Sequence, residues 1–209
     1  MASVASGPRR SAYLRSVSLA DPPIRAALVR DVVPGLIDGD PDGFWFHEMG
    51  LCEHRARVDL AVFNGHIHGI EIKSDRDTFA RLDQQAEVYN AVLDLITVVV
   101  GEAHEVTVES HVDEWWGISV AREGASGVLI DRIRPPEQNP QRDAEMIAHL
   151  LWRDEAVELL DRLGCARGVR SKPRYFVCKR LSEALPIEDL SREVRQTIKA
   201  RGDWRATPS

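Results

Sequence analysis

The sequence has few cysteines and no long apolar run, and both absences limit the class of protein. Its 209 residues include three cysteines, an odd number at spacings that match no disulfide framework. We therefore expect a reducing, cytoplasmic environment. No apolar run approaches the ~20 residues that span a membrane. Met1 to Val17 contains arginines but no apolar segment of a signal peptide, so we expect no membrane association.

The chain also lacks an excess of positive charge. Its formal net charge is −6, whereas proteins that bind nucleic acid through phosphates usually carry a basic patch. Residues 167–180 nevertheless contain six Lys and Arg side chains and no acid. Arg174 lies in this stretch and is a candidate for contacting phosphate. An ordinary solvated basic segment is the competing interpretation.

Two consecutive strands are predicted over residues 58–63 and 67–73. Both are rich in β-branched side chains, and Asn64-Gly65 between them is a strong hairpin signal. A two-residue loop would pair Asp59 with Ile70, whereas a three-residue loop pairs Asp59 with Glu71. Because a shift of one residue exchanges the two faces, the hydrophobic pattern favours the three-residue loop. The apolar face expected in that register consists of Val58, Leu60, Val62, Ile70 and Ile72.

In this register two carboxylates become cross-strand neighbours. The Cβ atoms of Asp59 and Glu71 would lie roughly 5 Å apart, and the carboxylates repel each other unless a proton or a cation lies between them. Carboxylate oxygens suit Mg²⁺ or Mn²⁺. Lys73 shares the same face, where it could hold a water and offset charge on a phosphate. The pattern predicts a metal site, and a solvated surface hairpin is the alternative.

A predicted helix over about residues 77–93 follows the second strand. It carries Arg81, Gln85 and Tyr89 at four-residue spacing on one face. If that face overlooks Glu71, Gln85 could hold a water or a phosphate, and Arg81 and Tyr89 could contact the backbone of a nucleic acid. The competing interpretation makes Gln85 a plain polar residue and Tyr89 part of the core.

These residues resemble the PD-(D/E)XK nuclease superfamily. Asp59, eleven intervening residues and then Glu71-Ile72-Lys73 are similar to its core motif, with Val58 in place of the proline. The segment 85–89 resembles the Q-x-x-x-Y motif of RecB-type members. The EIKSD-x-DT block within residues 71–85 resembles an uncharacterised bacterial family inside the superfamily.

The resemblance implies a restriction-endonuclease-like α/β fold, with a mixed β-sheet flanked by helices and a helical C-terminal extension. It implies Mg²⁺-dependent hydrolysis of phosphodiester bonds, with DNA the favoured polymer and Mn²⁺ a substitute metal. The implied metal ligands are Asp59, Glu71, the Ile72 carbonyl and an upstream acid. Lys73 and Gln85 would position the attacking water. A catalytically inactive nucleic-acid-binding module, or a partner-binding scaffold, is the alternative function.

The identity of the upstream acid is left open between two residues, with Glu48 as the candidate and Glu53 as the rival.

The order of predicted elements divides the chain into a flexible N-terminus (1–18), a core (19–135) and a helical extension packed on the core (136–209). The core is also expected to contain strands at 44–49 and 95–100, the latter parallel to that at 67–73, and closing strands at 116–121 and 128–133. The extension contains helices near 143–163, 174–184 and 187–201. The oligomeric state is open, and a homodimer is one option.

Overall fold

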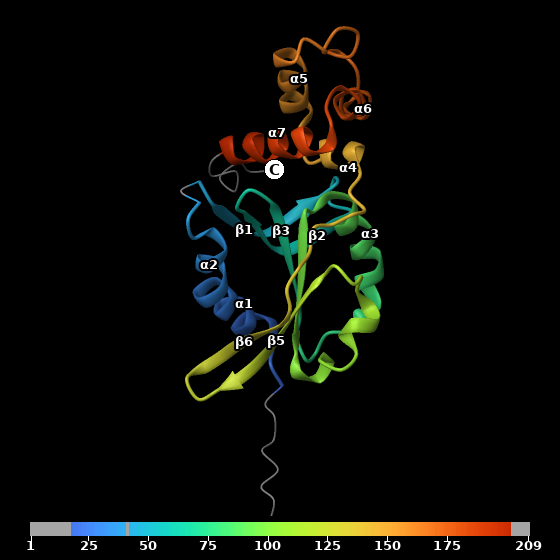
Figure 1. Ribbon diagram of the computed structural model, residues 1–209. Helices are drawn as coiled ribbons and strands as arrows, with labels where there is room; N and C mark the ends of the chain where they lie inside the picture. Colours follow the sequence, from blue (N-terminus) through green and yellow to red (C-terminus); the bar gives the residue numbers. More distant parts are fainter. Residues whose placement is uncertain (1–17, 41, 202–209) are drawn as a thin grey trace, which may run out of the picture.

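The computed structural model describes residues 18–40 and 42–201 and is built around one six-stranded sheet (Figure 1). The strand order follows the sequence, β1-β2-β3-β4-β5-β6. The strands are β1 (Phe44–Leu51), β2 (Ala56–Phe63), β3 (Ile67–Lys73), β4 (Leu95–Gly101), β5 (Gly117–Gly124) and β6 (Gly127–Arg134). The predicted N-terminal segment lies outside the described residues, apart from Ser18.

The sheet is mixed. β1, β2 and β3 pair antiparallel, β3, β4 and β5 pair parallel, and β6 returns antiparallel to β5. The predicted crossover between β3 and β4 is confirmed, because the two strands pair in parallel and a helix connects them. The α/β class with a mixed sheet flanked by helices is therefore correct. The finer expectation of a restriction-endonuclease-like sheet stays a prediction.

The β2–β3 register agrees with the hydrophobic argument. Ala61 pairs with Gly69 and Phe63 pairs with Ile67, so the loop between the strands has three residues. The expected apolar face forms, with one exception. Val58 packs in the other core cluster, together with Ala61. The strict alternation expected for Val58 is wrong because the strand is irregular here, where the facing Glu48 of β1 has a left-handed backbone (φ 55°).

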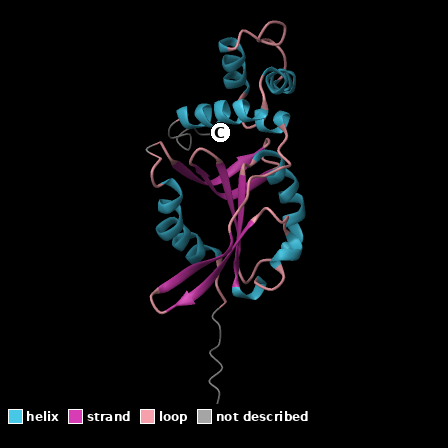
Figure 2. Ribbon diagram, in the orientation of Figure 1, coloured by secondary structure: helices cyan, strands magenta, loops and turns pink. Residues whose placement is uncertain are grey.

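Helices cover both faces of the sheet (Figure 2). One face packs against α1 (Asp21–Ala27), the π-helix η1 (Leu28–Val32) and α2 (Val33–Ile37). The other packs against η2 (Phe79–Arg81), α3 (Leu82–Val92) and the C-terminal helices. Two short 3₁₀ helices, η3 (Glu102–His104) and η4 (Val108–His111), join β4 to β5. No helix in the described part of the chain is long and apolar enough to cross a membrane.

Four helices follow the sheet and lie together above its upper end in Figure 1. They are α4 (Ala144–Ala148), α5 (Arg153–Arg162), α6 (Arg174–Ala184) and α7 (Ile187–Ala200). The single helix expected near 143–163 is wrong, since the chain turns between α4 and α5. Leu150 and Leu151 are buried at this turn, and the Trp152 N–H donates to the Glu155 carboxylate at 2.7 Å. Burial of the two leucines and this cap at the start of α5 stabilise the break.

Asp94 connects the C-terminal helices to the sheet. Its side chain is almost fully buried and accepts the Ile67 N–H of β3 at 2.7 Å. Arg142 and Arg195 lie 2.6 and 3.2 Å from the same carboxylate. A buried carboxylate needs such partners, because burial without them is costly. One acid therefore links β3, the segment before α4, and α7.

Asp94→Asn should lower the free energy of unfolding by about 3 kcal/mol, because it leaves two arginines without their buried counter-charge. Urea denaturation followed by circular dichroism measures the change. Asp154→Asn is the matched control, since Asp154 has an exposed side chain and, among residues 18–40 and 42–201, pairs with its neighbour Arg153 alone. A surface change of this kind should stay within about 0.5 kcal/mol. Equal losses in the two variants would contradict the proposed role of Asp94.

Candidate ligand-binding cleft

A polar cleft of about 640 Å³ lies beside the carboxyl end of β3. We refer to it as the β3 cleft. Its lining residues come from α1, from β1 and β2 with the turn between them, from the end of β3, and from the start of α3. Seven of the nine predicted site residues line it, and these are Glu48, Asp59, Glu71, Ile72, Lys73, Arg81 and Gln85. The fold therefore gathers most of the residues that the sequence pattern selected.

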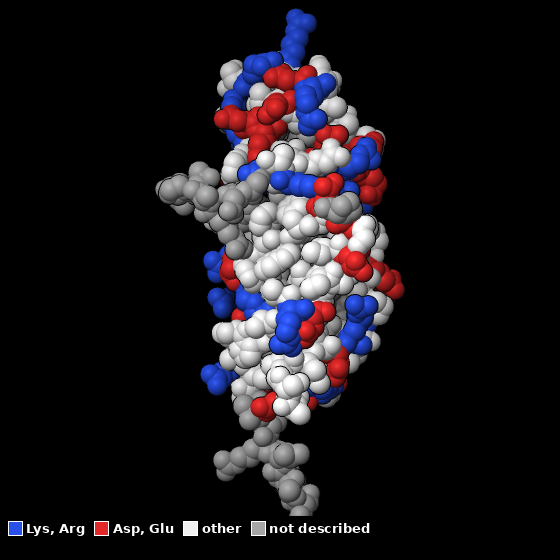
Figure 3. All heavy atoms as spheres, turned by 90° about the vertical axis from the view of Figure 1, so that its left-hand side faces the viewer, with Lys and Arg blue, Asp and Glu red and all other residues white. Residues whose placement is uncertain are grey.

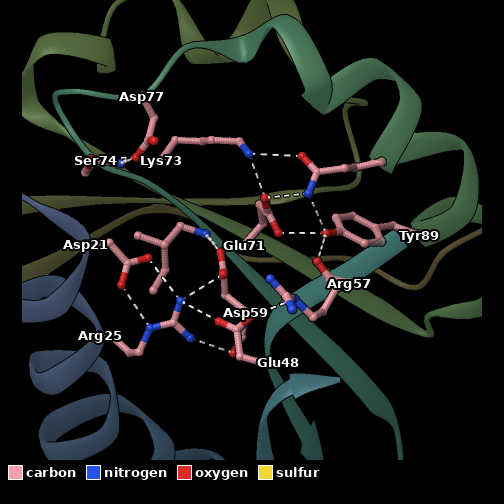
Figure 4. A network of polar contacts seen from close by, with 12 residues as sticks. Asp21, Arg25, Glu48, Arg57, Asp59, Glu71, Lys73, Ser74, Asp77 and Tyr89 are labelled. Atoms are coloured by element: carbon pink, nitrogen blue, oxygen red, sulfur yellow. Dashed lines mark hydrogen bonds and ion pairs between the residues drawn. The ribbon is translucent and has the colours of Figure 1, made fainter. Parts of the chain in front are cut away.

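Glu71 is the centre of the polar network in the floor of the cleft (Figure 4). Its side chain is 3% exposed, and one carboxylate oxygen lies 2.6 Å from Lys73 Nζ and 3.0 Å from Gln85 Nε2. The other oxygen is 2.7 Å from the Tyr89 hydroxyl. Gln85 also accepts from Lys73 Nζ at 3.0 Å. The floor is thus a closed set of hydrogen bonds between β3 and α3.

Burial dominates the electrostatics of the two central acids. Burial raises the pKa of Glu71, and the nearby Asp59 charge raises it further, while Lys73 and Tyr89 oppose the shift. Burial also raises the pKa of Asp59, against the Ile72 N–H and Arg25. The pKa of the Tyr89 hydroxyl is raised by burial and then by Glu71. The hydroxyl therefore stays protonated and serves as a hydrogen-bond donor.

Arg25 of α1 is the cation beside Asp59, and no sequence motif singled it out. Its guanidinium donates to Asp59 Oδ1 and to the Asp59 carbonyl, both at 2.8 Å. It also lies 2.9 Å from Asp21 and 3.1 Å from Glu48 (Figure 4). Burial alone would lower the pKa of Arg25, but its bonds to Asp21 and Asp59 outweigh burial and raise it. Only its four-residue spacing from Asp21 was readable in advance.

The residues do not fit the predicted divalent cation in this arrangement. Both oxygens of Asp59 accept hydrogen bonds, from Arg25 and from the Ile72 N–H at 2.7 Å. Both oxygens of Glu71 are equally engaged, and Glu48 contacts Arg25 and Arg57. Within residues 18–40 and 42–201, no three His, Cys, Asp or Glu side chains are grouped to hold a metal ion. The proposed cofactor, Mg²⁺ or Mn²⁺, stays a prediction without support from the geometry.

Of the two candidate upstream acids, Glu48 lies in the cleft lining and Glu53 does not. Glu48 lines the cleft and contacts two arginines of the network. Glu53 points elsewhere and pairs with Arg174 at 3.3 Å and with His149 at 3.9 Å. Arg174 does not belong to the cleft lining, and its guanidinium also donates to the His149 carbonyl at 2.5 Å.

Tyr89 is fully buried, so its ring has no surface that a nucleic acid could contact. Its hydroxyl lies 2.8 Å from the Arg57 carbonyl and within hydrogen-bond distance of Gln85 and Glu71. The predicted contact of Tyr89 with a nucleic acid backbone is replaced by a structural contact. Tyr89 orients the two side chains that form the floor.

A strained turn forms one side of the cleft. Within the described residues, four non-glycine residues have left-handed backbone angles, Cys52 (φ 48°), Glu53 (60°) and His54 (66°) in this turn and Glu48 (55°) in β1. Left-handed backbone costs a non-glycine residue roughly 1–2 kcal/mol. Such strain persists where the surrounding fold enforces it and often occurs at binding sites. The turn places His54 and Arg55 in the cleft lining, and no local sequence signal predicted it.

The fold and the cleft define an α/β protein with a mixed sheet and a polar, charge-balanced cleft. The chain belongs to the family described as bacteriophage P4 protein cII, whose model matches residues 17–205. Protein cII of Enterobacteria phage P4 is 26% identical over 123 residues. That match covers 59% of this chain and 47% of the phage protein, so the chain spans about half the length of its curated relative. No solved structure matches the chain.

The family assignment corrects the resemblance to the PD-(D/E)XK nuclease superfamily. The matching family is that of bacteriophage P4 protein cII, over nearly the whole chain, and it is not a nuclease family. The predicted Mg²⁺-dependent nuclease, with its inactive variant of the same fold, is therefore wrong. The acid–acid–lysine spacing is real, but here Arg25 and Lys73 pair with the acids. The broader expectation of an enzyme stays a prediction.

Replacing Glu71 with Gln should change how stability depends on pH. Because the folded pKa of Glu71 is raised, its stabilising contribution is fully present below the unfolded value of about 4.3 and is lost as pH rises through the folded pKa. The unfolding free energy of the wild type, minus that of Glu71→Gln, should therefore fall as pH increases from about 4. Urea denaturation at a series of pH values measures this difference.

Glu87→Gln on the exposed face of α3 is the control for this measurement. Its difference from the wild type should vary little with pH, because the side chain is solvated in both states. A Glu71→Gln difference that stays constant, or that grows with pH, would show that burial does not raise the pKa of Glu71.

Proposed function

We propose that the protein binds nucleic acid through the β3 cleft, with DNA the favoured polymer. The observation that carries the proposal is a pair of arginines in the cleft lining that are free to contact an anion. Arg55, in the turn before β2, and Arg81, in η2, are exposed and line the cleft from different elements. Neither side chain forms a hydrogen bond or an ion pair with any described residue. Arginine in this state is well suited to bind phosphate.

The charge balance of the cleft supports an anionic ligand, although the whole chain is acidic. Asp21, Glu48 and Asp59 contact Arg25, and Glu71 contacts Lys73. The fifth acid of the lining is Asp77, which accepts from the Ser74 N–H at 2.9 Å. Four of the five acids are thus compensated internally, and Arg55 and Arg81 add positive charge at the surface. With Arg25 included, five Lys and Arg side chains face the five acids, so the cleft is close to neutral although the whole chain carries −6.

The shape and chemistry of the cleft favour a polymer over a small apolar molecule. The floor is fully hydrogen-bonded within the protein, so a ligand would contact mainly the rim. The rim carries His54, Arg55, Arg81 and Gln84, side chains that suit phosphate and sugar oxygens. Phosphate contacts of this kind supply most of the affinity of sequence-independent nucleic acid binding. The strained turn that holds His54 and Arg55 supports a binding role for this rim.

Arg81→Gln and Arg55→Gln should each weaken binding of a nucleic acid about five- to tenfold at low salt. Each change should also reduce the slope of log affinity against log salt by about 1, because one phosphate contact is removed. Fluorescence anisotropy with labelled duplex DNA, single-stranded DNA and RNA of equal length measures both quantities. We expect the tightest binding with DNA.

Arg132→Gln is the matched control, because Arg132 is an exposed arginine with no ion pair among the described residues and belongs to pockets other than the β3 cleft. It should leave the affinity and the salt slope unchanged. An equal effect of all three changes would indicate a diffuse electrostatic attraction rather than a site. Absence of binding by the wild type to all three polymers at low salt would reject the proposed function.

A further inference from the structure

A second pocket lies on the face of the sheet that packs against η1 and α2. It consists of two adjoining hollows, of about 280 and 410 Å³, which share Val32, Leu36, Ser119 and Arg132. We refer to the two together as the α2 pocket. Side chains of β3, β4, β5 and β6 form its floor. Neither hollow shares a lining residue with the β3 cleft.

Most of the pocket wall is apolar. Leu28 and Val32 come from the helical side, and Ile70 and Val99 come from the sheet. Figure 3 looks onto the side of the molecule that carries α1 and α2, and it shows a broad uncharged area between groups of charged side chains. Apolar walls with a few polar groups are typical of small-molecule sites. The pocket therefore suits a ligand with an apolar body.

Two polar atoms inside the pocket lack a partner. His68 is 3% exposed, and its Nε2 lies 2.8 Å from the Thr97 hydroxyl, but its Nδ1 has no hydrogen-bond partner among the described residues. The Asn64 side-chain oxygen is also buried there without one. Burial, followed by the charges of His66 and Arg132, lowers the pKa of His68 to about 4. His68 is therefore neutral near pH 7, and buried polar groups without partners are uncommon in folded proteins.

Arg132 supplies the charge at the mouth of the pocket. Its side chain is exposed and forms no ion pair or hydrogen bond within the described part of the chain. The other charged side chains of the lining are already engaged. Arg134 donates to the Trp116 and Asp113 carbonyls, and Asp31 pairs with Arg30. Arg132 is thus the group available to an anion.

The backbone around the pocket is irregular on both sides. The wall includes the π-helix η1, whose wide turn is closed by the Val33 N–H donating to the Leu28 carbonyl. Pro34 has no N–H and crowds the carbonyl four residues before it, which accounts for the widened turn. The floor has a register shift between Ile118 and Ser119. Single π turns and β-bulges are both frequent beside functional sites.

We propose that the α2 pocket binds a small molecule with an apolar body and a single anionic group. The body would lie between η1–α2 and the sheet, and the anion would contact Arg132. His68 would offer its free ring nitrogen to a polar atom of the ligand. The site is independent of the proposed nucleic acid cleft, because the two share no lining residue.

Isothermal titration calorimetry of the full chain tests the proposal with three probes, namely octanoate, 1-octanol and acetate. We expect binding of octanoate, binding of 1-octanol at least about tenfold weaker, and no detectable binding of acetate. Arg132→Gln should weaken octanoate about tenfold without changing the melting temperature, whereas Arg81→Gln should leave octanoate binding unchanged. In the nucleic acid assay the expectation is the reverse, since Arg81→Gln should weaken binding there and Arg132→Gln should leave it unchanged.

A second variant fills the pocket instead of removing its charge. Leu36 is half-buried in α2 and lines both hollows, so Leu36→Trp should abolish octanoate binding while the protein stays folded. Failure of octanoate to bind the wild type would overturn the proposal. Equal binding of octanoate and 1-octanol, or unchanged octanoate binding in Leu36→Trp, would also overturn it.

Discussion

The buried carboxylate of Glu71 is the constraint on which the site depends. A carboxylate that is 3% exposed must be paired and hydrogen-bonded, or it will stay protonated. Lys73 supplies the charge from the same strand, and Gln85 and Tyr89 supply hydrogen bonds from α3. These contacts fix α3 against β3. The position of the helix, and with it one wall of the β3 cleft, follows from the need to satisfy one acid.

Asp59 is likewise paired with a cation, and this cation is Arg25 of α1. It crosses from α1 to the sheet and contacts Asp21, Glu48 and Asp59 together. A guanidinium is well suited to this place, because it presents several donors in a fixed plane. The two acids that suggested a metal ion are therefore each paired with a protein cation, Asp59 with Arg25 of α1 and Glu71 with Lys73 of β3. These ion pairs explain why the acid–acid–lysine spacing by itself indicated the wrong protein family.

The two faces of the sheet have different chemistry, and this difference follows from strand alternation. Residues of β3 that point toward α3 include Glu71 and Lys73, and those that point toward α1 and α2 include His68, Ile70 and Ile72. Glu71 and Lys73 line the β3 cleft, and His68 and Ile70 line the α2 pocket, so one strand contributes side chains to both sites.

The sequence by itself determined the local part of this protein. Periodicity and turn residues predicted the six strands, the three-residue loop between β2 and β3, and the parallel crossover, because these depend on residues close together in the chain. They placed Glu71 and Lys73 on one face of a strand and left the contact with Gln85 as one of two interpretations. Only the tertiary structure decided that Arg25 contacts Asp59, that Tyr89 is buried and that Leu150 and Leu151 break a helix. Those outcomes depend on packing between distant segments, which no local pattern records.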